Sequence, residues 1–302
     1  MSFLKFISGS SSALRPRLAC EITPAGVVAA RDGGSPDRQP VAAFAALPPG
    51  SVTAGLKPPN LPGAPAVVAA LEKVLNDVGA REKSLTVVIP DAAVRVLLLD
   101  FDSLPSRAQD ALPIVRFRVR KLVPFEVEDA AITYQVMHSN SSQIRAVVAI
   151  TPKDVLAEYE AVVRAAGYEP GVVLPSTIAA IASVAPGSAA LVVSRNGDSL
   201  TTVIANENQL LLHRTLDMPP SPSAQAEELQ QSVSVAMAYF EDTLTSQPSA
   251  LLCVGPGGAK EIAHMLADDS IQVRDLVPTP STGTTNAVPD GFLAGVTGAL
   301  AS

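Results

Sequence analysis

The chain has 302 residues, of which 47% are hydrophobic and 17% are charged, and its net charge is -7. This length and apolar content predict sizeable buried cores and exclude disorder throughout. The negative charge, the lack of Trp and the small numbers of Tyr (4) and Phe (8) argue against nucleic acid as a partner, because they leave neither a general positive field nor an aromatic platform for stacked bases.

The cysteines and the N-terminal residues indicate the cellular compartment of the protein. Cys20 and Cys253 have no CxxC partner, so neither a disulfide framework nor a zinc site is predicted, and a reducing cytoplasm fits. In residues 1–20, serines together with Arg15 and Arg17 interrupt the apolar stretch before a signal-peptide core forms. No apolar run reaches the roughly 18 residues of a transmembrane helix. We expect a cytoplasmic protein without direct membrane insertion, so any connection to a membrane must come through a partner.

Strands and a helix alternate in the first third of the chain. Residues 17–31 predict a hairpin that turns at Pro24 and Gly26. Residues 46–66 are rich in proline and predict an extended surface segment. Residues 65–83 place their apolar side chains on one helical face, so they predict an amphipathic helix.

The next segments predict further strands around one helix. Residues 84–90 and 95–101 are aliphatic runs typical of strands buried on both faces. Residues 106–122 alternate as a strand would, but the apolar spacing favours a helix kinked at Pro113. A hairpin across residues 138–143 is then followed by a second helix.

The second half predicts a similar series. The predicted elements are three strands in 188–218, a helix at about 222–245, a strand, glycine turn and helix in 250–266, a loop in 277–291 and a small-residue helix in 292–301. The residues expected on the apolar side of the long helix are Leu229, Val233, Val235, Met237 and Phe240. The two halves therefore resemble each other, with a hairpin-led sheet followed by helices in each.

Residues with catalytic potential are scarce. His138, His213 and His264 are isolated from one another and from carboxylates at metal-binding spacing. No nucleophile elbow or Walker A sequence is present. The residues alone predict no catalytic group and no metal site.

The duplicated layout resembles the actin-like ATPase fold. Several segments are similar, in order and spacing, to the PilM family, the cytoplasmic actin-like component of type IV pilus assembly that is related to FtsA. The most specific of them is LVPFEVEDAAITYQV at 122–136, and weaker ones are LTVVIP, AVVRAAGYEPGVV, LVVSRNGDSLTTVI and VGPGGA. The resemblance implies an α/β, duplicated ribonuclease H-like fold with an inserted small α+β subdomain. The implied first half is 15–185 with the insert at about 85–170, and the second half is 186–302.

The resemblance also implies a function. A member of this family is a scaffold of a type IV pilus or related secretion machine, and it binds the short cytoplasmic N-terminal tail of a PilN-like bitopic inner-membrane protein. A second copy of the chain is a further candidate partner. The tail would bind in a groove near the insert, whose expected lining is Arg116, Arg118, Arg120, Lys121, Pro124 and Phe125. The alternative is a solvated helix face whose cations pair with Glu126, Glu128 and Asp129.

ATP with Mg²⁺ is the cofactor that the resemblance implies, at three turns of the fold. The matching residues are Glu21 and Thr23 in the first turn, Asn196, Gly197 and Asp198 in the second, and Gly255, Gly257 and Gly258 in the third. The first two turns depart from the family pattern, because Pro24 removes a backbone donor and Ser194 replaces an aspartate. We therefore expect little or no ATP hydrolysis. The alternative is an active ATPase or sugar-kinase relative with Glu21 and Asp198 near the metal.

Overall fold

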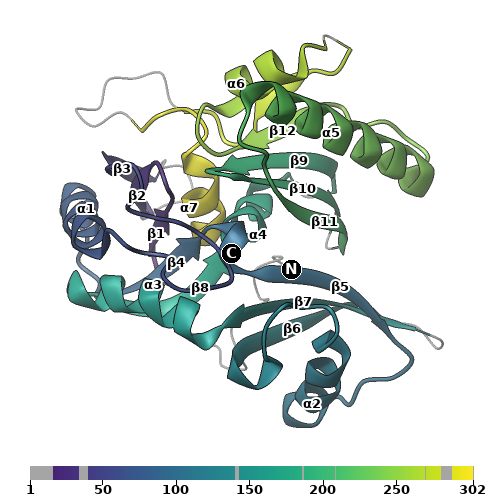
Figure 1. Cartoon of the computed structure of the whole chain (residues 1–302), viewed down its shortest axis with the longest axis horizontal. Coiled ribbons are helices and arrows are strands. Elements are labelled where there is room, and N and C mark those ends of the chain that lie inside the picture. The colour runs from purple at the N-terminus through teal and green to yellow at the C-terminus, as the bar shows by residue number, and fades with distance from the viewer. Residues whose placement is uncertain are drawn as a thin grey trace.

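The structure is a computed structural model that describes residues 16–33, 40–139, 143–185, 187–207, 209–268, 270–279 and 288–301 (Figure 1). The N-terminal segment 1–15, the centre of the predicted turn at 140–142 and residues 280–287 of the predicted loop lie outside these ranges. Within them, no helix combines the length and apolar character needed to cross a membrane.

The first sheet has five strands in the order β3-β2-β1-β4-β8. Its first three strands form an antiparallel meander, and β4 and β8 lie parallel to β1. The strands are β1 (Leu18–Ile22), β2 (Gly26–Arg31), β3 (Val41–Ala46), β4 (Ser84–Ile89) and β8 (Glu169–Pro175). The associated helices are α1 (Ala64–Asp77), α3 (Lys153–Ala165), α4 (Ser176–Ala180) and the 3-10 turns η1 (Asp91–Ala93) and η3 (Ile181–Ser183).

The second sheet repeats this topology in the order β11-β10-β9-β12-β13. Its strands are β9 (Ala189–Asn196), β10 (Ser199–Asn206), β11 (Gln209–Asp217), β12 (Leu251–Val254) and β13 (Val273–Asp275). Its helices are α5 (Pro222–Leu244), α6 (Gly258–Leu266) and α7 (Leu293–Leu300). The elements correspond one to one, with α1 matching α5, α3 matching α6 and α4 matching α7. The sequence-based prediction of a duplicated α/β layout is confirmed.

The insert lies between β4 and α3, where the second half has only the glycine turn between β12 and α6. It is an antiparallel sheet in the order β5-β7-β6 with one helix on it. Its elements are β5 (Arg95–Phe101), α2 (Ala108–Val119), the 3-10 turn η2 (Val127–Asp129), β6 (Ala130–Ser139) and β7 (Ile144–Pro152). β4 pairs within the first sheet and α3 packs against α1, so both belong to the first half and not to the insert. The paired strands of the insert therefore run from 95 to 152, which lies inside the expected range 85–170.

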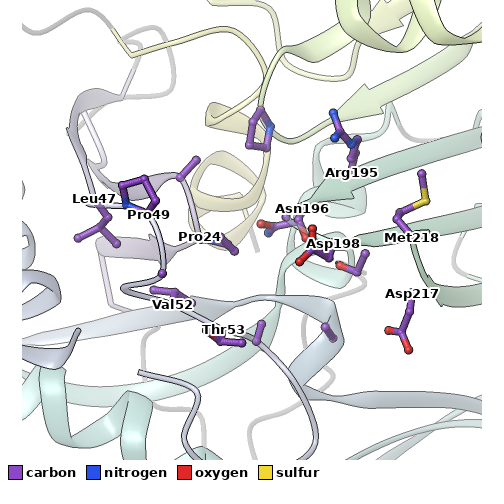
Figure 2. A pocket seen from close by; sticks show the side chains of 17 residues that line it. Pro24, Leu47, Pro49, Val52, Thr53, Arg195, Asn196, Asp198, Asp217 and Met218 are labelled. Atoms are coloured by element: carbon purple, nitrogen blue, oxygen red, sulfur yellow. Dashed lines mark hydrogen bonds between the residues drawn. The ribbon is translucent and has the colours of Figure 1, made fainter. Parts of the chain in front are cut away.

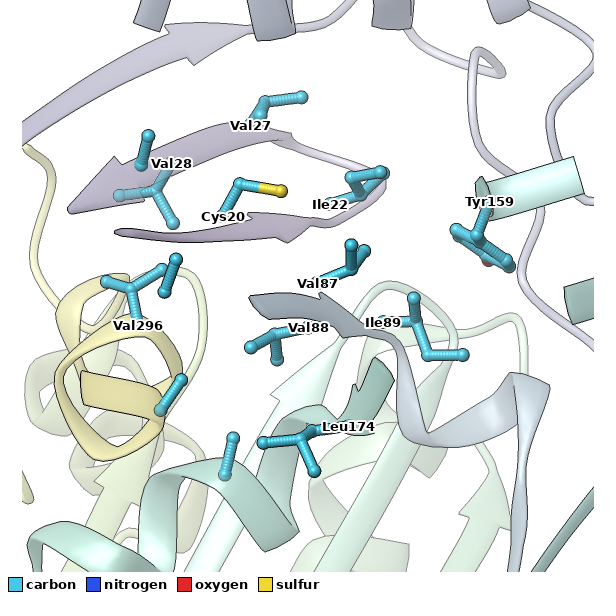
Figure 3. Close-up of a cluster of buried hydrophobic side chains, with 14 of the residues drawn as sticks. Cys20, Ile22, Val27, Val28, Val87, Val88, Ile89, Tyr159, Leu174 and Val296 are labelled. Atoms are coloured by element: carbon cyan, nitrogen blue, oxygen red, sulfur yellow. The ribbon is translucent and has the colours of Figure 1, made fainter. Parts of the chain in front are cut away.

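The helices α4 and α7 pack against each other and form a layer between the two sheets (Figure 1). Although α7 follows the second sheet in the chain, it contacts β1, β2 and β4 of the first. Val296 of α7 is fully buried beside Val28 and Val88, as Figure 3 shows. The expected range 186–302 for the second half therefore ends in a helix that fills the core of the first sheet.

Burial on both faces explains why the central strands are almost wholly apolar. All five side chains of β1 are buried, since α1 and α7 both contact the strands around it. The second sheet has its own outer core with α5 and α6, and the insert has a third core under α2.

One detail of the sequence-based prediction is wrong, namely the position of Val235. The segment 95–101 packs against a core on each face, because Leu99 and Phe101 lie under α2 while Val96 and Leu98 pack against the core of the first sheet. Val235 is 51% exposed and lies outside the buried stripe of α5, which Leu229, Val233 and Phe240 form. The segment 106–122 is helical as predicted, with Pro113 inside α2.

Candidate functional site

A cavity of about 590 Å³ lies where the β1–β2 and β9–β10 turns face each other, and Figure 2 shows its lining. Three of the predicted nucleotide-site residues, Asn196, Gly197 and Asp198, line it together with Pro24. The other lining residues are Ala25, Leu47, Pro49, Gly50, Val52, Thr53, Ala54, Ala92, Arg195, Ser199, Asp217, Met218 and Pro256. This is the position at which the predicted nucleotide would have to bind.

Glu21, the predicted acid of the first turn, lies behind the cavity and does not line it. Its side chain is 4% exposed and its carboxylate accepts a hydrogen bond from the Ser176 hydroxyl at the start of α4. A Cβ on Gly295 of α7 would overlap the same carboxylate, so the helix backbone lies directly against it. Burial raises the pKa of Glu21 to about 7, the Ser176 hydrogen bond lowers it and the charge of Asp91 raises it further.

The β1–β2 turn uses its polar groups internally. The Thr23 N–H donates to the Gly26 carbonyl at 2.9 Å, and the Thr23 hydroxyl donates to the same oxygen at 2.8 Å. The Gly26 N–H donates to the Thr23 hydroxyl oxygen at 3.1 Å, and Pro24 has no N–H. A phosphate cradle needs several backbone N–H groups directed at the anion, and this turn has already committed two of them.

The tips of the two hairpins lie close to each other, and Figure 2 shows Pro24 of one facing Asn196 of the other. Gly197 has a φ of +61°, and a Cβ built on it would lie 2.9 Å from Cγ of Pro24. The proline ring therefore lies against the second turn and forms part of the cavity wall. In the second turn, the Ser199 hydroxyl donates to the Asn196 carbonyl at 2.9 Å, which closes that turn on itself as well.

The glycines of the third turn contact protein atoms. A Cβ on Gly255 would overlap the Arg195 carbonyl oxygen, and one on Gly258 would overlap the Asp275 carboxylate. That carboxylate accepts a hydrogen bond from the Ala259 N–H at 2.7 Å. The N-terminus of α6, which could bind an anion, thus already holds the side chain of Asp275. Predicted site residues Gly255, Gly257 and Gly258 lie outside the cavity lining, and their turn contributes only Pro256.

Taken together, these contacts do not fit Mg-ATP. Pro24 offers no backbone donor and lies against Gly197 at the edge of the cavity, the helix N-terminus is capped by Asp275, and Glu21 is enclosed by α4 and α7. Asp198 lines the cavity, but no described group of three His, Cys, Asp or Glu side chains converges as a metal site.

Sequence analysis missed Asp91 and Arg195. Asp91 is buried behind Glu21 and accepts hydrogen bonds from the N–H (3.0 Å) and the hydroxyl of Thr177. Burial raises the pKa of Asp91 to about 6, and hydrogen bonds from Thr177 and Thr201 lower it. The sequence signal that could have identified Asp91 is its position directly after the apolar run 84–90.

Arg195 reaches the cavity from the end of β9. Its guanidinium pairs with Glu261 of α6 and donates to Gln225 of α5 at 3.2 Å, while its Nε has no hydrogen-bond partner among the described residues. The side-chain oxygen Oδ1 of the neighbouring Asn196 is also buried without a partner in the described part of the chain. Both atoms are shielded from solvent, so this edge of the cavity contains two buried polar groups without a hydrogen-bond partner in the described part of the chain.

The six residues of the predicted peptide groove lie on α2 and the segment after it, and they line neither of the two cavities described in this section. Arg116 donates to the main-chain carbonyl of Val127, and Arg120 pairs with Glu128, one of the three acids named in the alternative prediction. Arg118, Lys121 and Pro124 are exposed, and Phe125 packs against the core of the insert.

A second cavity of about 250 Å³ lies between β8, at one edge of the first sheet, and β6, at one edge of the insert. Leu156 and Glu160 of α3 complete its wall. The remaining lining residues are Ile89, Val94, Ala131, Ile132, Thr133, Ala149, Ile150, Thr151, Pro170, Gly171, Val172, Val173, Leu174 and Pro175. Glu160 is the one charged side chain of this lining within the described chain.

The comparisons with known proteins find likeness in structure. No protein-family model and no curated protein matches the sequence. Among solved structures, the chain is similar to one from a PilM-PilN type IV pilus biogenesis complex, with a TM-score of 0.68 and 18% identity over 83% of this chain and 87% of that one. It is also similar to the cytoplasmic domain of EpsL, an inner-membrane component of the type II secretion system of Vibrio cholerae, with a TM-score of 0.50 and 12% identity over 94% of this chain and 92% of that one. Together with the repeated strand order, this likeness confirms the predicted α/β actin-like fold with an insert.

Proposed function

We propose that this protein is a non-catalytic actin-like scaffold of a type IV pilus or related secretion machine, located in the cytoplasm. It binds the cytoplasmic N-terminal tail of a PilN-like bitopic membrane protein and is thereby recruited to the inner membrane. The fold shared with a chain of the PilM-PilN complex and with the EpsL cytoplasmic domain supports this proposal. The observation that carries it is the apolar groove between β8 and β6.

Two edge strands border this groove. In the described sheets, β8 pairs only with β4, and β6 pairs only with β7, so each strand has one edge without a strand partner. An extended peptide can add to such an edge through main-chain hydrogen bonds, while pockets beside it select alternate side chains. The 250 Å³ between the strands suits small aliphatic side chains. We therefore place the tail here, beside the insert but away from the cations of α2.

The proposal is tested by binding of fluorescent tail peptides from bitopic proteins encoded beside this chain. Thr133→Arg places a long cation in the groove, and we expect it to weaken binding at least about tenfold by blocking the apolar wall. Thr53→Arg is the matched control, because Thr53 lines the other cavity. It should change the affinity by less than about twofold.

Two outcomes would contradict the proposal. One is that no tail peptide binds the unmodified chain. The other is that Thr53→Arg weakens binding as much as Thr133→Arg does, which would place the peptide in the cavity between the hairpins.

We also predict that Mg-ATP neither binds nor stabilises the protein. A ligand present at 100 times its Kd raises the free energy of unfolding by about 2.7 kcal/mol, so a thermal shift at millimolar Mg-ATP detects even micromolar affinity. We expect no shift and no calorimetric heat, because Pro24 removes a backbone donor from the first turn and Asp275 already caps the N-terminus of α6. Mg-ATP turnover that Glu21→Gln abolishes would instead support the alternative, an active ATPase or sugar-kinase relative.

A further inference from the structure

The outer face of α2 and the residues directly after the helix carry exposed apolar side chains. Seven large hydrophobic residues are exposed in the described part of the chain, and three of them, Ile114, Phe117 and Leu122, lie within nine consecutive positions. Phe117 is the most exposed, at 79%. Single exposed apolar residues are ordinary on a protein surface, but a cluster around an almost fully exposed aromatic ring indicates a contact surface.

The helix geometry explains why Phe117 projects outward. Ala111, Val115 and Val119 follow one another at intervals of four residues and are buried on the core of the insert. A residue two positions after Val115 lies about 200° around the helix, which places Phe117 opposite the buried stripe. Figure 1 shows α2 at one extremity of the molecule, on the far side of the insert from α5 and α6.

Cations accompany this apolar cluster. Arg118 and Lys121 are exposed, and neither lies within ion-pair distance of a described acid, although the charge of Arg118 contributes to lowering the pKa of Asp100. The other two cations of the run, Arg116 and Arg120, are held by Val127 and Glu128. The overall charge of -7 therefore coexists with a local cationic patch beside Phe117. Fields from charges more than about 10 Å away are largely screened at physiological salt, so the local patch decides what approaches α2.

We propose that this face of α2 rests on a bilayer surface that contains anionic phospholipids. Phe117 and Leu122 would enter the headgroup region, and Arg118 and Lys121 would contact the phosphates. A protein partner would need a pocket for a ring that projects this far, whereas the lipid interface accepts a protruding apolar side chain without one. The contact is peripheral, and it complements the proposed tail binding, because two weak attachments together hold a protein at a membrane.

The experiment uses the absence of Trp from the sequence. Phe117→Trp creates a single fluorescent reporter at the centre of the patch, and Val235→Trp creates a control on the exposed side of α5. On addition of vesicles of 30% phosphatidylglycerol in phosphatidylcholine, we expect the emission of Phe117→Trp to shift to the blue. High salt should reverse the shift. Pure phosphatidylcholine vesicles should not cause it, and Val235→Trp should not respond to either vesicle.

The charge dependence gives a second, independent readout. With Phe117 unchanged, Arg118→Gln and Lys121→Gln combined should weaken cosedimentation with the anionic vesicles about 25-fold, or about fivefold for each cation near the surface. The control pair Lys57→Gln and Arg81→Gln removes the same charge elsewhere and should change binding less than about twofold.

Four results would overturn the proposal. Equal loss of binding in the two charge pairs would mean that only the overall charge matters. An unchanged Phe117→Trp spectrum with anionic vesicles would exclude the bilayer. A blue shift that grows with protein concentration in the absence of vesicles would assign the face to a second copy of the chain. A shift with tail peptide alone would assign it to the proposed tail.

Discussion

Gly298→Ala is expected to lower the free energy of unfolding by about 3 kcal/mol. A Cβ at this position would overlap the carbonyl oxygen of Ala179 in α4. The obstructing atom belongs to the backbone and not to a movable side chain, so α7 and α4 would have to separate along the layer between the two sheets. Urea denaturation followed by circular dichroism measures the loss.

The control for this prediction is Gly55→Ala. A Cβ on Gly55 would meet no atom within 4 Å, so this change should alter the free energy of unfolding by no more than about 0.5 kcal/mol. If Gly298→Ala were as harmless as Gly55→Ala, the close approach of α7 to α4 would be wrong. The same result would weaken the assignment of α7 to the core of the first sheet.

The free energy of unfolding of Glu21→Gln, relative to that of the unmodified protein, should increase by about 3 kcal/mol between pH 4.5 and pH 8. Burial raises the pKa of Glu21 from 4.5 to about 7, so the folded protein holds this proton more tightly than the unfolded chain does. The stability due to the protonated form is fully present below pH 4.5 and is lost as the pH rises through 7. Glutamine stays neutral and does not lose it.

The measurement is the difference in the free energy of unfolding between Glu21→Gln and the unmodified protein at several pH values. Exposed acids such as Asp100 change the stability with pH in the opposite direction, because the hydrogen bond from Arg145 lowers the pKa of Asp100. Their contribution is the same in both proteins and cancels in the difference. Asp91, the charged neighbour of Glu21, is present in both proteins. The exposed Glu227→Gln is the control and should show no pH-dependent difference. A flat difference for Glu21→Gln as well would mean that water reaches the Glu21 carboxylate.

Local patterns predicted most of the fold. The hairpin turn at Pro24 and Gly26, the strand in 84–90 and the helix in 65–83 all follow from alternation, apolar runs and helical spacing, and the structure contains each of them. The sequence could not predict which sheet the helix in 292–301 packs against. Its small apolar residues can pack closely against many surfaces, and nothing in them specifies the first sheet over the second.

The candidate site was predicted less completely. The sequence showed that Pro24 removes a donor, but it could not show that the ring lies against Gly197 or that Asp275 caps α6. Glu21 matches a metal-facing acid in sequence, yet Gly295, far along the chain, encloses it. Contacts between distant residues decide both features, and no local pattern encodes them.

The proposed tail groove had no signal in the sequence. Whether a strand lies at an edge depends on strand order, and β8 and β6 become neighbours of one cavity only because the insert folds back beside the first sheet. The prolines at both ends of β8, Pro170 and Pro175, agree with an edge position but do not require it.

The position of α7 also has a consequence for biosynthesis. β8, the last strand of the first sheet, ends at Pro175, but α7, which packs on the face of this sheet opposite α1, begins only at Leu293. A ribosome needs on the order of 10 s to translate the intervening segment. During that interval the nascent first sheet exposes the apolar side chains that Val296 and its neighbours later cover. We therefore expect the newly made N-terminal half to depend on chaperones until the second half has emerged.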